Sequence, residues 1–215
     1  MDVTIIGAGN MGRGIGTRLV AGGNNVKILD TDPEQAQQLA EQLEAGATNG
    51  GAAEGGGAGD PISGDVVVLA IWYEPAKAAI ERYGDQLDGK VVVDITNPVD
   101  VETFDGLVTP PDSSAAEELA KLAPAGAKLV KAFNTTFAGT LVAGRLADQP
   151  LDVLIAGDDH QAKATVVELA KAGGLNAIDA GPLKRARELE ALGFLHMTLQ
   201  DGLGTGYGSA VKVIS

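Results

Sequence analysis

The chain has 215 residues, 45% of them hydrophobic and 21% charged, which is typical of one globular domain with a small appendage and excludes a disordered chain. Its net charge of −13 predicts a solubilising acidic surface, or adaptation to a salty host, and argues against nucleic acid and membrane lipid as partners, because both need clustered Lys and Arg. Cysteine is absent and the two histidines, His160 and His196, are too few for a histidine-built centre, so we expect no disulfide and no metal.

The first half of the chain alternates short strands with helices. Residues 2–6 form a β-branched run, and residues 10–21 place apolar side chains at four-residue spacing, which predicts a strand followed by a helix. Residues 26–29 predict the second strand. Asp32 and Pro33 are typical of the first residues of a second helix, because Asp can cap it and Pro fits its first position.

Residues 45–60 are rich in glycine and predict a flexible surface segment, with a short third strand near residues 47–49. Residues 65–71 are continuously apolar, as a parallel strand covered on both faces should be. The longest apolar run, residues 66–73, is much shorter than the roughly 18 residues of a membrane helix. No basic and apolar signal sequence precedes the first strand, so we expect a cytoplasmic protein.

The second half continues the alternation. Further strands are predicted at residues 90–95, 127–132, 151–156 and 175–178, and further helices at residues 75–83, at 114–124, from Asp158 onward and at 185–203. This pattern predicts an α/β fold, a doubly wound and mainly parallel Rossmann sheet over residues 1–183, with a small C-terminal helical extension at residues 184–215 that completes the cleft. Every strand-to-helix loop is then expected at one edge of the sheet, where ligands bind.

The loop Gly7-Ala8-Gly9-Asn10-Met11-Gly12 follows the first strand and opens the first helix, which is the context of a dinucleotide-binding loop. Gly7 permits a tight turn, Gly9 lets the backbone approach a pyrophosphate, and Gly12 lets the helix pack against the strand. The free N–H groups of the helix start would face the phosphates.

Asp30 stands at the end of the second strand, at the usual distance from the glycine loop for a residue that binds the adenosine ribose. Its carboxylate can accept hydrogen bonds from the ribose hydroxyls and would repel a 2′-phosphate. Because no Lys or Arg follows nearby, Asp30 favours NAD over NADP.

Three further strand ends are expected to line the nicotinamide side of the same cleft. They are Ala70-Ile71-Trp72, Thr96-Asn97-Pro98 and Phe133-Asn134-Thr135. Trp72 either faces the cleft or is partly buried against a helix, whereas Asn97 and Asn134 are polar groups placed at ligand-binding turns. The sequence contains no evident triad, carboxylate pair or metal cluster, so we assign no catalytic residue. Hydride transfer between two organic cofactors needs stacking and orientation more than acid–base help.

Longer motifs extend this pattern along nearly the whole chain. They are Gly7 to Gly14, Asp94-Ile95-Thr96-Asn97-Pro98, Ser113-Ser114-Ala115-Ala116-Glu117, Val130-Lys131-Ala132-Phe133-Asn134-Thr135, Gly157-Asp158-Asp159 and Asp179-Ala180-Gly181-Pro182-Leu183. With these motifs the chain resembles the family of NADP oxidoreductases dependent on coenzyme F420, a deazaflavin. It is also similar to the cytosolic reductase domain of the six-transmembrane metalloreductases, which share the Lys-Ala-Phe-Asn segment.

The resemblance implies hydride transfer between a nicotinamide and a deazaflavin or flavin (FMN or FAD) stacked against it, in a homodimer. It implies that Gly7 to Gly12 hold the pyrophosphate and that a second group frames the redox cleft, namely Trp72, Asn97, Pro98, Phe133, Asn134 and Thr135. Family members that use NADP typically have Ser-Arg where this chain has Asp30-Thr31, so the resemblance favours NADP while Asp30 favours NAD. Asn134 stands where some deazaflavin-using members have His, which leaves deazaflavin and flavin both open.

Three alternatives remain open. Lys184, Arg185 and Arg187 either offset an anionic deazaflavin tail or form a solvated helix face paired with Glu188 and Glu190. A small-substrate dehydrogenase would share the N-terminal motif, but the chain after residue 178 is too short for the extra helical domain of such enzymes. A dinucleotide-sensing module without turnover would also lack acid–base residues.

Overall fold

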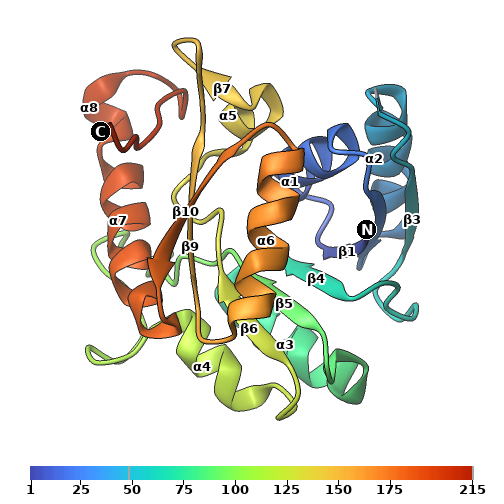
Figure 1. The fold of residues 1–215 in the computed structure, drawn as a ribbon. Coiled ribbons are helices and arrows are strands. Elements are labelled where there is room, and N and C mark those ends of the chain that lie inside the picture. Colours follow the sequence, from blue (N-terminus) through green and yellow to red (C-terminus); the bar gives the residue numbers. More distant parts are fainter. Residues whose placement is uncertain (48, 215) are drawn as a thin grey trace.

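The computed structural model describes residues 1–47 and 49–214. At its centre lies a sheet with the strand order β10-β9-β6-β5-β4-β1-β2-β3 (Figure 1). Its strands are β1 (Asp2–Ile6), β2 (Asn25–Asp30), β3 (Ala53–Gly57), β4 (Val66–Leu69), β5 (Val91–Asp94), β6 (Lys128–Lys131), β9 (Asp152–Gly157) and β10 (Asn176–Gly181). A separate hairpin pairs β7 (Arg145–Leu146) with β8 (Gln149–Pro150).

The helices cover both faces of the sheet (Figure 1). One face packs against α1 (Asn10–Ala21), α2 (Pro33–Ala45), α5 (Ala138–Ala143) and α6 (His160–Ala172). The other packs against α3 (Tyr73–Tyr83), α4 (Ala115–Leu122) and the start of α7 (Ala186–Thr198), with the short 3-10 turns η1 (Gly84–Leu87) and η2 (Leu183–Arg185). The chain continues from α7 into α8 (Gln200–Leu203). This architecture confirms the doubly wound, mainly parallel α/β sheet with a small C-terminal helical extension.

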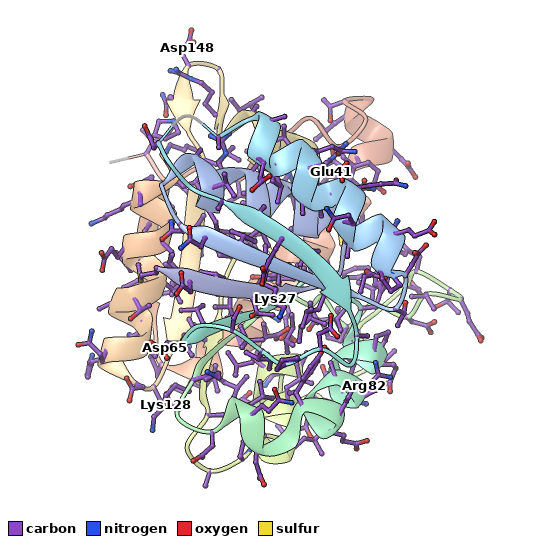
Figure 2. All side chains as sticks on the ribbon, turned by 90° about the vertical axis from the view of Figure 1, so that its right-hand side faces the viewer. Lys27, Glu41, Asp65, Arg82, Lys128 and Asp148 are labelled. Carbon is purple, nitrogen blue, oxygen red and sulfur yellow. The ribbon has the colours of Figure 1, made fainter. Side chains whose placement is uncertain are left out.

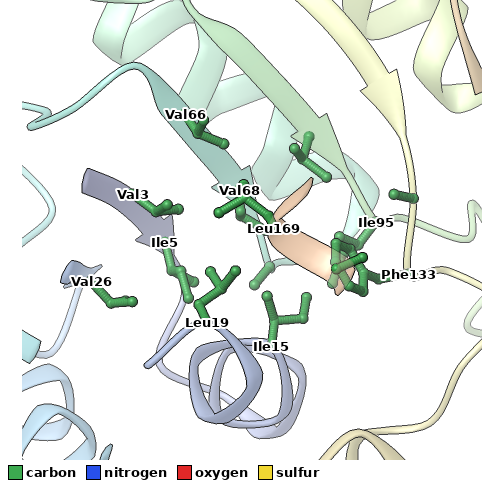
Figure 3. Close-up of a cluster of buried hydrophobic side chains, with 14 of the residues drawn as sticks. Val3, Ile5, Ile15, Leu19, Val26, Val66, Val68, Ile95, Phe133 and Leu169 are labelled. Carbon is green, nitrogen blue, oxygen red and sulfur yellow. The ribbon is translucent and has the colours of Figure 1, made fainter. Parts of the chain in front are cut away.

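Each helix layer buries its own side of the sheet. Ile15 and Leu19 of α1 pack with Ile5 and Val68 in one apolar cluster (Figure 3). Val67, the neighbour of Val68, belongs to the cluster on the opposite face. Strand β4 is therefore covered on both sides, which explains its continuously apolar sequence and confirms that prediction.

The predicted helix starts at Asp32 and Ser114 are confirmed. The carboxylate of Asp32 accepts hydrogen bonds from two backbone N–H groups in the first turn of α2. Ser114 Oγ accepts a hydrogen bond of 3.2 Å from the Glu117 backbone N–H, and it donates one of 2.8 Å to the Glu117 carboxylate. The start of α6 differs by one residue, because Asp159 and not Asp158 caps it.

The prediction for residues 45–60 is wrong in two ways. The third strand lies at Ala53–Gly57 and not near residues 47–49, of which residue 48 is outside the described part of the chain. Three of the glycines, Gly55, Gly56 and Gly57, belong to this edge strand, which pairs in parallel with β2. A Cβ added at Gly55 would lie 2.4 Å from the backbone nitrogen of Gln37, so glycine allows α2 to pack closely on β3.

The expectation that every strand-to-helix loop lies at one edge is wrong for β9 and β10. Strand β9 pairs antiparallel to β6 through Val130↔Gly157, and β10 runs parallel to β9. After β6 the chain forms the six-residue α5 and the β7–β8 hairpin in place of a long crossover helix, so β9 begins at the edge where β6 ends. The loops after β9 and β10 therefore lie at the edge opposite the glycine loop.

Charged side chains such as Glu41, Arg82 and Asp148 lie on the outside of the molecule (Figure 2). Within the described residues, no helix combines the length and the apolar composition needed to cross a membrane. The same residues contain no group of His, Cys, Asp and Glu that could hold a metal ion.

Candidate functional site

A cleft of about 450 Å³ opens where β1 and β4 lie side by side in the sheet. The chain runs outward from β1 to β2 and β3, then returns past β1 to β4, so this is the point at which the strand order reverses. A more open groove of about 710 Å³ lies along α6 and β10, but it contains no residue of the glycine loop or of the three predicted strand-end loops. We therefore take the cleft between β1 and β4 as the candidate site.

Most of the predicted cofactor-binding residues lie on the walls of this cleft. They are Gly7, Gly9, Asn10, Met11, Asp30, Ala70, Ile71, Trp72, Thr96, Asn97 and Asn134. The structure adds six lining residues that sequence reasoning missed: Gln35, Ile95, Thr136, Phe137, Met197 and Tyr207. Met197 and Tyr207 come from the C-terminal extension, in which no local pattern singles out the residues that face the cleft.

Six other predicted residues do not line the cleft. Ala8, Gly12, Pro98, Phe133 and Thr135 are buried, and Thr31 is exposed outside it. Phe133 differs most from the expectation, because it is 3% exposed and belongs to the apolar core beneath α1 (Figure 3). Its φ of 63° turns the chain sharply, so the side chain points into the core while the next residue, Asn134, reaches the cleft.

The glycines of the loop have two roles: Gly7 and Gly12 are needed for the fold, whereas Gly9 leaves space for a ligand. Gly7 has a φ of +113°, and a Cβ added at Gly12 would lie 2.0 Å from the Gly7 carbonyl oxygen, so both positions require glycine in the protein itself. A Cβ added at Gly9 would meet no atom within 4 Å. Gly9 is the N-cap of α1, no side chain caps this helix, and its first turn contains no acidic residue. The uncapped N–H groups fit a pyrophosphate.

Two backbone hydrogen bonds fix the carboxylate of Asp30 beside the glycine loop. Its Oδ2 accepts a hydrogen bond of 2.7 Å from the Ala8 backbone N–H, and its Oδ1 accepts one of 3.0 Å from the Asp32 backbone N–H. The carboxylate remains partly exposed on the cleft wall. Because these bonds hold the carboxylate before any ligand arrives, binding to a ribose would cost little side-chain entropy.

Asn97 and Asn134 form a mutually bonded pair at the other side of the cleft. Asn97 Nδ2 donates to the Asn134 carbonyl oxygen, and Asn134 Nδ2 donates to Asn97 Oδ1, both at 2.9 Å. Asn134 Nδ2 also donates to the carbonyl oxygen of Leu189 on α7. A Cβ added at Gly193 of α7 would lie 2.6 Å from Asn97 Oδ1, so α7 supports the pair from behind at van der Waals distance.

Three aromatic side chains, Trp72, Phe137 and Tyr207, line the cleft. Trp72 is 61% exposed, so the alternative in which it is partly buried against a helix is wrong. Phe137 stacks on His196 with ring centroids 4.3 Å apart and meets the ring of Tyr207 edge-on at 5.0 Å. Burial lowers the pKa of His196 below its ordinary value, so this ring is neutral at neutral pH. The cleft thus offers flat apolar surfaces to a ring-shaped ligand.

Hydrogen bonds hold the segment around Tyr207 in place. Ser209 Oγ lies 2.8 Å from His196 Nε2, and farther along, Lys212 Nζ and the Val213 backbone N–H bind the carboxylate of Asp152. Burial by itself would raise the pKa of Asp152, but hydrogen bonds from Lys212, Asn176 and Val213 lower it below its ordinary value. We define residues 204–214 as the tail.

We expect Lys212→Met to loosen the tail without unfolding the sheet. Loss of one bond to a charged group, worth about 1.5 kcal/mol, should speed hydrogen exchange of the Val213 amide about tenfold. The lowered pKa of Asp152 means that its bonds persist at neutral pH and are lost as the pH falls below the ordinary carboxyl range. Unchanged exchange at Val213 would contradict the anchoring role of Lys212.

Comparison with known proteins places the chain in a family. The model for "NADP oxidoreductase coenzyme F420-dependent" matches residues 2–98. The F420-dependent NADP reductase of Methanocaldococcus jannaschii is 32% identical over 211 residues, which cover 89% of each chain. The chain belongs to the F420-dependent NADP oxidoreductase family. The crystal structure of a putative F420-dependent NADP-reductase from Arthrobacter sp. FB24 matches with a TM-score of 0.84 and 28% identity, covering 99% of both chains.

Members of other groups share parts of this arrangement. Metalloreductase STEAP3 of Rattus norvegicus is 35% identical over 190 residues, which cover 88% of this chain but only 36% of the length of that relative. A reductive aminase from Aspergillus terreus matches with a TM-score of 0.67 at 18% identity, which shows a shared fold alone.

The late motifs of the family lie away from the cleft. Asp158 Oδ1 accepts a hydrogen bond of 2.9 Å from the Leu183 backbone N–H, and both carboxylate oxygens of Asp179 lie 2.9 Å from Lys163 Nζ. The first contact joins the loops after β9 and β10, and the second joins β10 to α6; the reversal of β9 has moved both loops to the opposite edge. In this chain the late motifs therefore stabilise the fold.

The basic residues after Pro182 lie at that same edge. Arg185 pairs with Glu188 at 2.9 Å, as the solvated-face alternative predicts, but Glu190 is buried and bonds elsewhere. From Arg185 the helix α7 extends roughly 18 Å before it reaches Met197 in the cleft. The prediction that Glu190 pairs with the basic residues is wrong, because α7 turns that side chain inward.

Proposed function

We propose that this protein transfers a hydride between a nicotinamide dinucleotide and a deazaflavin or flavin stacked beside it. The observation that carries the proposal is the composition of the cleft. Its described walls join the uncapped start of α1 to the aromatic side chains of Trp72 and Tyr207. Asp30 is the one carboxylate among these lining residues, which include no Lys, Arg or His. Flat surfaces with few acid–base groups suit hydride transfer between two rings.

Each part of the cleft has a role in this proposal. The first-turn N–H groups of α1 bind the pyrophosphate, and Asp30 accepts hydrogen bonds from the adenosine ribose. Asn97 and Asn134 hold the nicotinamide end, and Trp72, Phe137 and Tyr207 exclude water from the paired rings. The nicotinamide and the second ring supply the redox chemistry, in which two electrons and one proton pass directly between them. The protein orients the partners and shields them from solvent.

Four further features complete the proposal. Asp30, with the exposed Thr31 beside it, favours NAD, although the family is named for NADP. Residues 184–215 act as an extension that completes the cleft of the domain formed by residues 1–183.

The protein works as a cytoplasmic homodimer. Leu195, Leu199 and Leu203 support the dimer, because they are about half exposed and follow one another at four-residue spacing.

A matrix of turnover assays tests the reaction. Each of NADH and NADPH is mixed with F420, FMN or FAD, and absorbance is followed for loss of the reduced nicotinamide. We expect turnover with at least one pair. Tight dinucleotide binding without turnover in any of the six mixtures would instead indicate a sensing module. The sole tryptophan, Trp72, lies in the cleft, so its emission reports binding independently of turnover.

A further inference from the structure

A cluster of three buried charged side chains lies directly behind the cleft. Lys131 Nζ is 2.8 Å from Asp94 Oδ2 and 2.8 Å from Glu190 Oε1, and all three side chains are at most 1% exposed. Asp94 and Lys131 face each other on the neighbouring strands β5 and β6. We call these three residues the ion cluster.

The ion cluster joins four segments of the chain. Lys131 Nζ also donates to the Thr96 carbonyl oxygen, and Asp94 Oδ1 accepts a hydrogen bond of 2.8 Å from the Thr96 backbone N–H. Glu190 accepts hydrogen bonds from the backbone N–H groups at the start of α4, at 2.9 and 3.3 Å. The cluster therefore ties together the loop after β5, strand β6, the start of α4 and helix α7. Three of the family motifs meet here.

The ties through Thr96 and through α7 lead to the Asn97–Asn134 pair. Thr96, which the cluster holds at both its N–H and its carbonyl oxygen, directly precedes Asn97. Glu190 fixes α7, and the adjacent Leu189 accepts the hydrogen bond of Asn134 Nδ2. Farther along the same face of α7, Gly193 lies against the pair and Met197 lines the cleft.

The chemistry of the ion cluster favours a role in orienting the groups that it joins. Burial by itself would lower the pKa of Lys131, but Asp94 and Glu190 raise it above its ordinary value, so the ammonium group keeps its charge. Buried ion pairs seldom add net stability over apolar residues of the same size. Their hydrogen bonds are directional, however, and accept only one arrangement of the groups that they join.

We infer that the ion cluster of Lys131, Asp94 and Glu190 positions the Asn97–Asn134 pair, and through that pair the nicotinamide end of a bound dinucleotide. The second part of this inference rests on the proposed function, whereas the first part does not. The three charged residues are positioning residues, because none of them lines the cleft.

The test variant is Lys131→Met/Glu190→Gln, which removes one positive and one negative charge together. A second variant, Glu190→Gln alone, keeps the Lys131–Asp94 pair and serves if the double variant does not fold. Lys163→Met is the control, because it removes an ion pair between a nearly buried lysine and the exposed carboxylate of Asp179 at the opposite edge of the sheet. Three properties are measured in each variant: the side-chain amide resonances of Asn97 and Asn134 by NMR, kcat, and dinucleotide affinity.

We expect both amide resonances to shift in the test variants and to remain in place in Lys163→Met. A misplacement of about 1 Å can cost about 100-fold in rate, so kcat should fall about tenfold to 100-fold. Dinucleotide affinity should change much less than kcat, because the glycine loop and Asp30 are untouched.

A folded test variant that keeps both amide resonances would overturn the inference, as would shifted resonances with an unchanged kcat. An equal loss of kcat in Lys163→Met would reduce the effect to general destabilisation and overturn it as well. If no cofactor pair supports turnover even in the unmodified protein, the proposed function fails and the NMR comparison alone decides whether the cluster positions the pair.

Discussion

Gly9→Ala should weaken dinucleotide binding about 100-fold, a loss of about 3 kcal/mol, while the protein remains folded. The added Cβ meets no protein atom within 4 Å, and the φ of −74° at this position suits alanine. Alanine is a poorer N-cap than glycine, which destabilises the helix, but it also reduces the conformational freedom of the unfolded chain, which stabilises the fold. Because these effects oppose each other, the free energy of unfolding should change by less than about 1 kcal/mol. The methyl group would instead occupy the space where a pyrophosphate approaches the N–H groups of α1.

Gly12→Ala is the matched comparison for Gly9→Ala. Its Cβ would lie 2.0 Å from the Gly7 carbonyl oxygen, so the start of α1 must move away from β1. Overpacking of this kind costs about 1–3 kcal/mol or more in stability. Thermal unfolding should therefore separate the two variants, while titration of Trp72 emission with NADH should show weak binding in both. Binding by Gly9→Ala at the strength of the unmodified protein would refute the assignment of the glycine loop to a pyrophosphate.

Asp30→Ser combined with Thr31→Arg should move the ratio of NADPH to NADH affinity about 100-fold toward NADPH. Removal of the carboxylate ends its repulsion of a 2′-phosphate, and an arginine adds hydrogen bonds between charged groups that are worth about 1.5–3 kcal/mol. Loss of the Asp30 hydrogen bond to the Ala8 N–H should also lower NADH affinity, because the carboxylate no longer holds the glycine loop. Parallel titrations of the two dinucleotides give the ratio directly.

Glu34→Ser serves as the control for that exchange. Glu34 is exposed in the first turn of α2 and does not line the cleft, so its loss changes the net charge without changing the ribose contacts. The ratio should stay near that of the unmodified protein. An equal change in Glu34→Ser would assign the effect to overall charge, and tighter binding of NADPH than of NADH by the unmodified protein would refute the role of Asp30.

Elements with a strong local signal could be predicted from the sequence. The apolar run of β4, the caps at Asp32 and Ser114 and the glycine loop each carry their structure within a few residues. Asp30 was also predictable, because its place depends only on the spacing between β1 and β2. These features fix the part of the cleft that would hold the pyrophosphate and the adenosine ribose.

The predictions that failed concern features that depend on tertiary structure and not on local sequence. The direction of β9 depends on the path that the chain takes after β6, which the apolar pattern of β9 itself does not contain. Gly55 indicates flexibility by composition, yet it serves close packing with α2. The position of Lys131 was a signal that the sequence analysis missed. Lys131 ends an apolar strand and Asp94 ends the strand before it, which suggests a buried ion pair.

The cleft draws its walls from both ends of the sequence, from Gly7 at the start to Tyr207 in the tail. A chain that emerges from the ribosome therefore contains a complete glycine loop long before it has a complete cleft. Contacts between residues this far apart form late and slow folding, because a long loop must close before they contribute. A dinucleotide that touches both ends would hold them together, so the melting temperature should rise with its concentration. The tail should gain protection from hydrogen exchange last during folding and lose it first during unfolding.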